Sequence, residues 1–235
     1  LDLGFIHSLR KIVPMLPKRR QTMFFSATMP PAIAELARQF LTDPAKVAVA
    51  PQATTAERVD QQVMFVEKRE KPALLAATLQ AIDLDQAIVF TRTKHGADKV
   101  VRQLAAAGIE AQAIHGNKSQ PQRERALAAF RAKSLKVLVA TDIAARGIDV
   151  PGVSHVINYE LPNVPEQYVH RIGRTARAGA DGMAISFCDG EERAYLRDIE
   201  RLTRIRLDQQ PLPSGFMAIV KAHDLAMKAS PSAVI

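Results

Sequence analysis

Short apolar runs recur along the chain, and most of them span four to six residues rich in Val, Ile, Phe and Ala. They are apolar at nearly every position, which is typical of strands that are covered on both faces of a sheet. We therefore predict strands over Thr22–Ser26, Val47–Ala50, Val63–Val66, Ala87–Phe90, Ala111–Ile114, Val137–Ala140, Val153–Asn158 and Met183–Phe187.

The segments between these runs carry apolar residues at helical spacing. In residues 31–41, for example, Ile33, Leu36 and Phe40 fall on one face of a helix. Strands that alternate with helices indicate βαβ units, so we predict an α/β fold: a doubly wound parallel sheet with helices on both faces. The predicted helices are Pro31–Leu41, Lys71–Ile82, His95–Ala107, Gln120–Arg131, Pro165–Ile172 and Glu191–Leu202.

The domain organisation follows from where the pattern weakens. Residues 51–58 are polar and aperiodic, which predicts an interdomain linker. Residues 59–208 are predicted to form the doubly wound domain, whereas residues 1–50 are too few for such a domain and are interpreted as the C-terminal remnant of another one. Residues 209–235 are a C-terminal extension, either flexible or folded as a helix over Phe216–Lys228 that packs back on the domain.

Composition and charge narrow the class of protein. The chain has 235 residues, of which 47% are hydrophobic, and its formal net charge of +8 favours polyanionic partners, above all nucleic acid. The single cysteine, Cys188, excludes an internal disulfide or a Cys-based zinc site and fits a reducing, cytoplasmic environment. No apolar run reaches the roughly 18–20 residues that cross a bilayer, so we expect no membrane partner.

Polar residues directly follow four of the predicted strands. Ligands of an open parallel sheet bind beyond the carboxyl ends of its strands. The hydroxyls, amides and cations found there suit phosphate oxygens and sugars. Any one of them could be a helix cap, but four sites at one edge indicate a ligand. The segments are Ser26-Ala27-Thr28, Thr91-Arg92-Thr93-Lys94, His115-Gly116-Asn117-Lys118 and Thr141-Asp142.

Three arginines follow one another at intervals of three residues: Arg171, Arg174 and Arg177. Like charges this close repel one another unless an anion is near, and Arg is the cation best suited to bidentate phosphate contact. The alternative is a solvated basic face. Gly173 and Ala176 leave little bulk around the cations, as is required where another surface approaches closely, and this favours a phosphate site.

Taken in order, these segments resemble the motifs of DEAD-box ATP-dependent RNA helicases, and the resemblance covers roughly residues 1–208. The form of the last motif is most similar to the bacterial RhlE-type subgroup, although Ala176 stands where many members have Gly. The matching segments are Ser26–Thr28 (SAT), Val89–Lys94 (motif IV), Gln120–Arg123 (QxxR), Ala140–Asp149 (motif V) and His170–Arg177 (motif VI).

The same resemblance implies that segments of a longer protein are missing. The chain holds neither a GxxxxGK[ST] phosphate loop nor Asp-Glu-Ala-Asp. In the family that tetrad stands just before a segment like Leu1–Phe5, so we expect a fragment that starts there, with the SAT part of the first RecA-like domain and the complete second one.

The nucleotide roles are those that the resemblance implies. ATP binds between two RecA-like domains, and Arg174 and Arg177 are expected to reach its γ-phosphate as arginine fingers. Gly147 and Asp149 are expected to bind the nucleotide, with Asp149 accepting hydrogen bonds from the ribose. For Asp149 the alternative is a turn residue before Pro151.

Coupling between the domains is assigned by the same resemblance. His170 and Arg171 are expected to pair across the closed interface with the first RecA-like domain, near the coupling residues Ser26, Ala27 and Thr28. The ligands of the accompanying Mg²⁺ are expected in that first domain, which is a partner of this chain. We expect a monomer, with almost no ATP turnover by the chain alone.

RNA is expected on a separate surface that contacts the sugar–phosphate backbone and couples to ATP through local duplex unwinding. Two alternatives remain open at this stage: a non-catalytic RecA-like RNA-binding module, and a DNA helicase of the same superfamily. The candidate RNA-binding residues are Thr91, Arg92, Gly116, Gln120, Arg123, Thr141 and Asp142.

Overall fold

The chain divides into two compact units, Leu1–Gln52 and Ala53–Ile235. The computed structural model describes residues 6–26, 29, 31–47, 59–82, 84–145, 150, 152–176 and 182–229. The predicted linker at residues 51–58 therefore lies outside the described residues.

The described residues of the first unit form two helices, α1 (Ile6–Ile12) and α2 (Pro31–Phe40), with a 3-10 turn, Val13–Met15, after α1. The prediction of a helix from Pro31 is confirmed, and α2 buries Ile33 and Leu36. The strand predicted over Thr22–Ser26 is not formed. A strand needs a hydrogen-bonded neighbour, and the described residues of this unit offer none. The strand predicted at residue 47 falls almost wholly outside the described residues.

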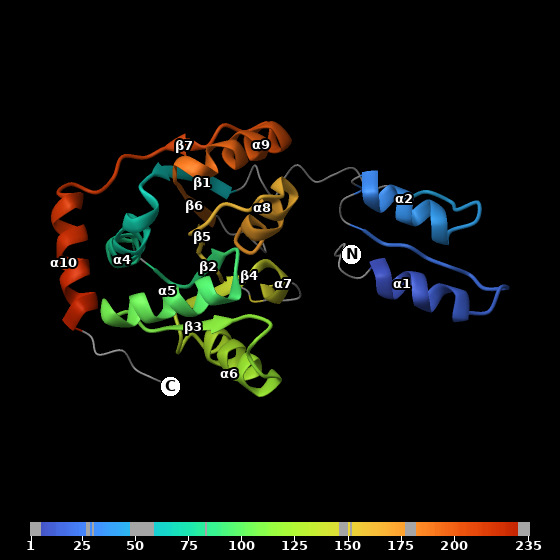
Figure 1. Ribbon diagram of the computed structural model, residues 1–235, viewed down its shortest axis with the longest axis horizontal. Coiled ribbons are helices and arrows are strands. Elements are labelled where there is room, and N and C mark those ends of the chain that lie inside the picture. Colours follow the sequence, from blue (N-terminus) through green and yellow to red (C-terminus); the bar gives the residue numbers. More distant parts are fainter. Residues whose placement is uncertain are drawn as a thin grey trace. The chain divides into compact units, whose positions relative to one another are not determined.

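The second unit is built on a seven-stranded sheet in the order β3-β4-β2-β5-β6-β1-β7, and every pair in it is parallel (Figure 1). The six predicted strands of this unit are confirmed, with boundaries that shift by up to four residues. The strands are β1 (Val59–Phe65), β2 (Ala87–Thr91), β3 (Ala111–Ile114), β4 (Val137–Thr141), β5 (His155–Asn158), β6 (Gly182–Cys188) and β7 (Asp208–Gln209).

Helices cover both faces of this sheet. Alternate residues of each inner strand point to opposite faces, so Ala87 and Val89 pack with α4, α5 and α10, while Ile88 and Phe90 pack with α6 and α7. A third cluster joins α8 and α9 to β1 and β6. The helices are α4 (Lys71–Ala81), α5 (Lys94–Ala106), α6 (Gln120–Arg131), α7 (Asp142–Ala145), α8 (Pro165–Ile172), α9 (Arg193–Thr203) and α10 (Phe216–Ala229).

The C-terminal segment folds back onto the second unit. Asp208–Gln209 extends the sheet as β7 beside β1, and α10 packs against α4 and α5 with Phe216 buried. Of the two alternatives for this segment, the packed helix is therefore the one observed for residues 216–229. No helix in the described part of the chain is long and apolar enough to span a membrane.

Candidate functional site

The polar segments that follow the inner strands meet at one edge of the sheet. Thr91 and Thr141 are partners in the β2–β4 register, and Ile114 aligns with Ala140 where β3 ends beside β4. The next residues along the chain, Arg92, His115 and Asp142, therefore lie at the same carboxyl edge. The expectation that these motifs gather at one edge agrees with this register.

Arg171 anchors α8 to this edge from the inside. Its side chain is 1% exposed, and its Nε and Nη2 donate to the two carboxylate oxygens of Asp142 over 2.6 and 2.8 Å. Nη1 donates to Asn158 Oδ1 and to the backbone oxygen of Glu160, at 3.2 and 2.7 Å, and the guanidinium lies 5.1 Å from the centre of the Phe90 ring. Arg171 thus satisfies its charge within its own domain.

Two expected roles fall on this buried pair. Arg171 was expected to pair across an interface with another domain, and within its own domain its hydrogen bonds are made to β5, α7 and the loop after β5. Asp142 was expected to contact RNA, and both of its carboxylate oxygens accept from Arg171. Both roles stay predictions. The paired geometry joins motif V to motif VI, and sequence spacing gave no sign that these two residues meet.

The turn after α8 is fixed by Thr175. Its hydroxyl donates to the backbone oxygens of Val153 and Ser154, and the residue is 1% exposed. Gly182, at the start of β6, packs directly against it: a Cβ at this position would lie 2.3 Å from Thr175 Oγ1. Ala176 follows with φ of +53°, in the left-handed region. Gly adopts such a φ without the steric cost that a Cβ brings.

Arg174 and His170 lie on the outer side of this anchored turn. Arg174 is half-buried, and its Nε donates to the backbone oxygen of His170 over 3.3 Å; His170 is exposed. Because Arg171 and Thr175 hold the chain on either side, the position of Arg174 is defined by buried contacts. A cation placed in this way can meet an anion without first being ordered.

A second charged network lies under the start of motif IV. Arg92 Nη2 is 3.4 Å from Glu192 Oε1 and 3.6 Å from Glu160 Oε1, and its backbone N–H donates to Glu160. Glu192 also pairs with the buried Lys71, which lies 3.0 Å from Asp189. Burial raises the pKa of Glu192 in spite of Lys71. Carboxylates of its own domain thus lie on one side of Arg92, and its side chain is still 27% exposed.

Thr91 and Thr141, both expected to contact RNA, are buried. The Thr91 hydroxyl donates to the backbone oxygen of Thr93 over 3.1 Å, and Thr93 in turn caps α5 by accepting from Gly96. In this structure Thr91 supports the turn that starts α5, and its hydroxyl is not presented to a ligand.

The loop after β3 is tied to α5. His115 Nε2 and Lys118 Nζ lie 3.0 and 2.9 Å from the same oxygen, Asp98 Oδ1. Burial of Asp98 raises its pKa, but hydrogen bonds from His115 and Lys118 outweigh this effect, and the net pKa is lowered. These contacts fix the loop while Gly116 stays exposed.

Helix α6 begins directly after this loop with a capping box between Ser119 and Gln122. Gln120 and Arg123 lie three residues apart in its first turns, and Arg123 Nη1 donates to Gln120 Oε1 over 3.4 Å. Arg123 Nε is buried without a hydrogen-bond partner in the described residues. An unsatisfied guanidinium N–H is costly, so this position favours an incoming acceptor.

Several predicted site residues cannot be placed. Ser26 is described and exposed, whereas the remaining ones lie outside the described residues: Ala27, Thr28, Gly147, Asp149 and Arg177. Within the described part of the chain, no group of three His, Cys, Asp or Glu side chains could hold a metal ion.

Sequence reasoning missed the buried carboxylates and the residues that hold the motifs in place. Glu192 and Asp189 form a capping box at the start of the turn before α9, and a capping-box pattern is visible in a sequence. Lys71, which neutralises them, lies far away along the chain and carried no local signal. The same holds for Asn158 and Gly182.

Known helicases are similar to this chain in sequence. The family model "Helicase conserved C-terminal domain" matches residues 70–179. The chain is 42% identical over 207 residues to "ATP-dependent RNA helicase CshA" of Limosilactobacillus reuteri, covering 88% of this chain and 42% of that protein. It is 42% identical over 214 residues to "DEAD-box ATP-dependent RNA helicase CshA" of Bacillus subtilis, covering 91% of this chain and 43% of that protein. The chain thus spans less than half the length of these curated relatives.

Solved structures extend the comparison. A structure of E. coli DEAD-box protein SrmB bound to regulator of ribonuclease activity A matches with a TM-score of 0.64 and 34% identity, over 67% of this chain and 93% of that one. S. cerevisiae Dbp5 bound to RNA and ADP BeF3 matches with a TM-score of 0.80 and 29% identity, over 96% of this chain and 60% of that one.

The parallel sheet, with its motifs gathered at the carboxyl edge, defines the second unit as a RecA-like helicase C-terminal domain. With relatives of this identity and coverage, the chain belongs to the DEAD-box family of RNA helicases. The narrower assignment to the RhlE-type subgroup is not confirmed, since the relatives named above are CshA proteins.

Proposed function

We propose that this chain is the C-terminal part of an ATP-dependent DEAD-box RNA helicase, which couples ATP binding and hydrolysis to RNA binding and local duplex unwinding in the cytoplasm. The observation that carries the proposal is the meeting of motifs IV, QxxR and V at one edge of a parallel sheet, with motif VI hydrogen-bonded to motif V through Arg171 and Asp142. The yeast neighbour Dbp5, bound to RNA and ADP BeF3, supports it.

Arg174 and Arg177 are proposed to meet the phosphates of ATP held mainly by the first RecA-like domain. The phosphoanhydride bond of ATP supplies the free energy of the cycle. Guanidinium groups at its γ-phosphate stabilise the charge that spreads over the equatorial oxygens during transfer. Gly147 and Asp149 are proposed to bind the nucleotide, with Asp149 at the ribose, and the Mg²⁺ ligands to lie in the first domain.

Arg171 is proposed to be a positioning residue for Arg174. Three points favour this role: its burial, its bidentate pair with Asp142, and its place three residues before Arg174 in the same turn. His170, which is exposed, remains the candidate for contact with the first domain, near Ser26–Thr28. The chain is proposed to act as a monomer with that domain as its partner.

The RNA surface is proposed to centre on Gly116, Gln120 and Arg123. Gly116 and Gln120 are exposed, and Arg123 keeps a buried N–H without a partner among the described residues. Arg92 and Thr141 complete the surface, while Thr91 and Asp142 are proposed to shape it from behind. Contacts of this kind read the backbone, so sequence preference is weak and salt dependence strong.

The nucleotide role is tested in the complete parent protein. Arg174→Gln and Arg177→Gln are each expected to lower RNA-stimulated ATP hydrolysis by roughly 10³-fold or more. The matched control is Arg197→Gln, which removes the same charge from an exposed position of α9. Hydrolysis that is unchanged in both motif VI variants would contradict the proposal.

The RNA role is tested in the 235-residue chain itself. Arg123→Ala is expected to weaken RNA binding and to reduce the slope of log affinity against log salt by about 1. RNA should compete better than DNA of the same sequence, because 2′-hydroxyl contacts distinguish the two; equal competition would favour a DNA helicase. The chain alone has no phosphate loop in its sequence, so we expect almost no ATP turnover from it.

A further inference from the structure

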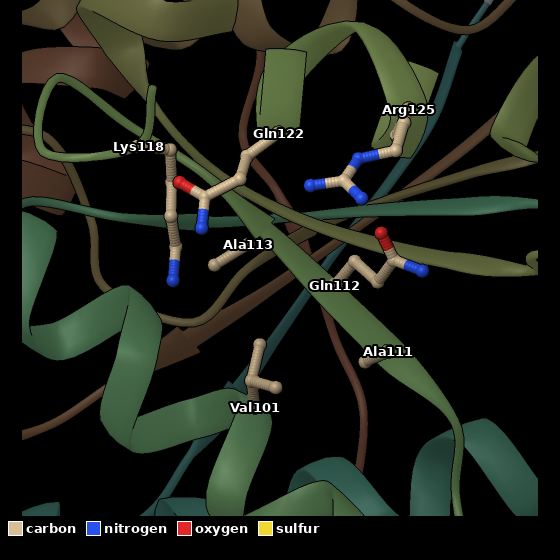
Figure 2. A pocket seen from close by; sticks show the side chains of 7 residues that line it. All are labelled: Val101, Ala111, Gln112, Ala113, Lys118, Gln122 and Arg125. Carbon is tan, nitrogen blue, oxygen red and sulfur yellow. The ribbon is translucent and has the colours of Figure 1, made fainter. Parts of the chain in front are cut away.

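A hollow of roughly 380 Å³ lies along strand β3, which forms one end of the sheet. We call it the edge pocket. Figure 2 shows Gln122 and Arg125 reaching toward the strand from α6 and Val101 facing it from α5. Gln112 of β3 and Lys118 of the following loop also line the pocket. Its volume is at the lower end of the range for small-molecule pockets.

The helices that form the walls of the edge pocket are strongly basic. Together, α5 and α6 carry six Lys or Arg residues and only two acidic ones, Asp98 and Glu124. Asp98 is already paired with His115 and Lys118. Arg102 and Arg125 are exposed and form no ion pair within the described residues. Of the two cations that line the pocket, Lys118 is paired with Asp98, whereas Arg125 is paired with no carboxylate of the described residues. An anion placed here would therefore meet one unpaired guanidinium.

The pocket also offers amide groups beside an apolar wall. The Gln122 oxygen accepts from Ser119, which leaves its NH₂ group to donate elsewhere. The Gln112 amide makes no hydrogen bond within the described residues and is half-buried. Amides that both donate and accept match the edges of nucleobases, and Val101 provides an apolar surface for a base face. Phosphate, base edge and base face are thus all matched by the lining.

The residues of the edge pocket lie close in sequence to those of the proposed RNA surface. Lys118 lies two residues after Gly116, and Gln122 and Arg125 each lie two residues after Gln120 and Arg123 in the same helix. Residues two apart in a helix point in different directions, so Gln122 and Arg125 line the edge pocket while Gln120 and Arg123 do not. An RNA strand would have to curve around the start of α6 to reach both.

We propose that the edge pocket holds one nucleotide of bound RNA, with Arg125 and Lys118 at the phosphate and Gln112 and Gln122 at the base edge. This inference rests on the proposed RNA surface and adds to it a contact that reads the base. The domain would then have a base preference at one position of an otherwise sequence-tolerant binding site.

The test compares two variants of α6 that lose the same charge, Arg125→Ala and Arg131→Ala. Affinities of the 235-residue chain for labelled single-stranded oligo(A), oligo(C) and oligo(U) RNA are measured by fluorescence anisotropy. Arg125→Ala is expected to weaken binding at least about fivefold and Arg131→Ala much less. Gln112→Leu is expected to change the ranking of the three RNAs, because it removes hydrogen bonds to a base edge.

The outcomes separate this inference from the one on which it rests. Equal losses of RNA affinity in Arg125→Ala and Arg131→Ala, together with an unchanged ranking of the three RNAs in Gln112→Leu, would overturn the edge pocket as a nucleotide site. If Arg123→Ala still weakened RNA binding in that case, the proposed RNA surface would stand. An effect of Arg125→Ala without any effect of Arg123→Ala would support the pocket and remove the proposed surface. Binding of an acidic peptide that is lost in Arg125→Ala, while the RNA affinity of that variant is unchanged, would overturn the nucleotide site in favour of a protein partner.

Discussion

Two groups of cations in the second unit differ in what surrounds their charge. Arg171 and Lys71 are each 1% exposed and lie within ion-pairing distance of carboxylates of the same unit. Arg102 and Arg125, on the helices beside β3, are exposed and pair with no carboxylate within the described residues. The first group holds the domain together, whereas the second is available to an anion from outside.

This difference shows that membership of a motif does not define what a residue does. Arg171 and Arg174 belong to the same short segment, yet Arg171 is buried in the domain and Arg174 is half-buried at its surface. A buried cation that loses its partners is strongly destabilising, while an exposed one costs little to remove. Substitutions in the buried group should therefore lower stability most, whereas substitutions in the exposed group should lower ligand affinity and leave stability nearly unchanged.

The largest expected effect comes from Lys71→Met, which leaves the buried Asp189 and Glu192 without their ammonium partner. We expect unfolding free energy to fall by about 3–5 kcal/mol, measured by urea denaturation of the 235-residue chain. The matched control from the other group is Arg125→Ala, which should stay within about 0.5 kcal/mol. Equal losses in the two variants would remove the distinction between the groups.

The same variant carries a pH signature. Burial raises the pKa of Asp189, but the hydrogen bond and charge of Lys71 outweigh this effect and hold it below its usual range. Its stabilising contribution is present above the unfolded pKa and is lost as pH falls through the folded one. Without Lys71, only backbone hydrogen bonds oppose the effect of burial, so the pKa of both carboxylates is higher than in the parent chain. The folded variant then binds more protons than the folded parent, and its stability falls behind as pH rises. The deficit of Lys71→Met should be larger at neutral pH than in mild acid.

A somewhat smaller loss of stability is expected for Arg171→Met, which keeps an unbranched apolar stem but removes the guanidinium and its four hydrogen bonds. Asp142 is partly exposed and can be hydrated, so we expect a loss of about 3 kcal/mol. RNA affinity of the folded variant should fall as well, because Asp142 and the turn of motif VI lose their anchor. A variant as stable as the parent chain would show that this buried pair does not hold motifs V and VI together.

Packing against motif VI can be probed without changing any charge. In Gly182→Ala, the new Cβ would lie 2.3 Å from Thr175 Oγ1 and 2.6 Å from the backbone nitrogen of Ala176, so the turn must shift. We expect a loss of about 1–3 kcal/mol by thermal or urea denaturation. Gly190→Ala is the control, because a Cβ there meets nothing within 4 Å. Similar stabilities of the two variants would contradict the close contact.

The sequence predicted the second unit well because its short apolar strands and its amphipathic helices each carry a local signal. The helices over Gln120–Arg131 and Pro165–Ile172 were predicted with the observed boundaries. The strand predicted over Thr22–Ser26 is absent, since pairing depends on a neighbouring strand and not on the run itself. Local pattern is thus a good guide to elements that carry their own signal and a poor one to elements that need a distant partner.

For the candidate site, the motifs identified which segments matter but not which side chains face a ligand. Thr91, Arg171 and Asp142 have the residue types of a phosphate or sugar site, yet each is used internally. The partner of Thr91 is local, whereas Arg171 and Asp142 find each other across 29 residues of sequence. Pairings across that distance are set by tertiary structure, and no spacing in a single sequence encodes them.

The smallest expected effect sharpens the description of the motif VI turn itself. Ala176 has φ of +53°, a region that costs a residue with a Cβ roughly 1–2 kcal/mol. Ala176→Gly removes that cost but adds unfolded-state entropy, so we expect a net gain of up to about 1 kcal/mol. The same chemical change at Ala105, an exposed position of helix α5, should instead destabilise by about 1 kcal/mol. Denaturation curves that shift in the same direction for both variants would show that the left-handed turn is not strained. Shifts in opposite directions would show that the fold places Arg174 at a small cost in backbone energy.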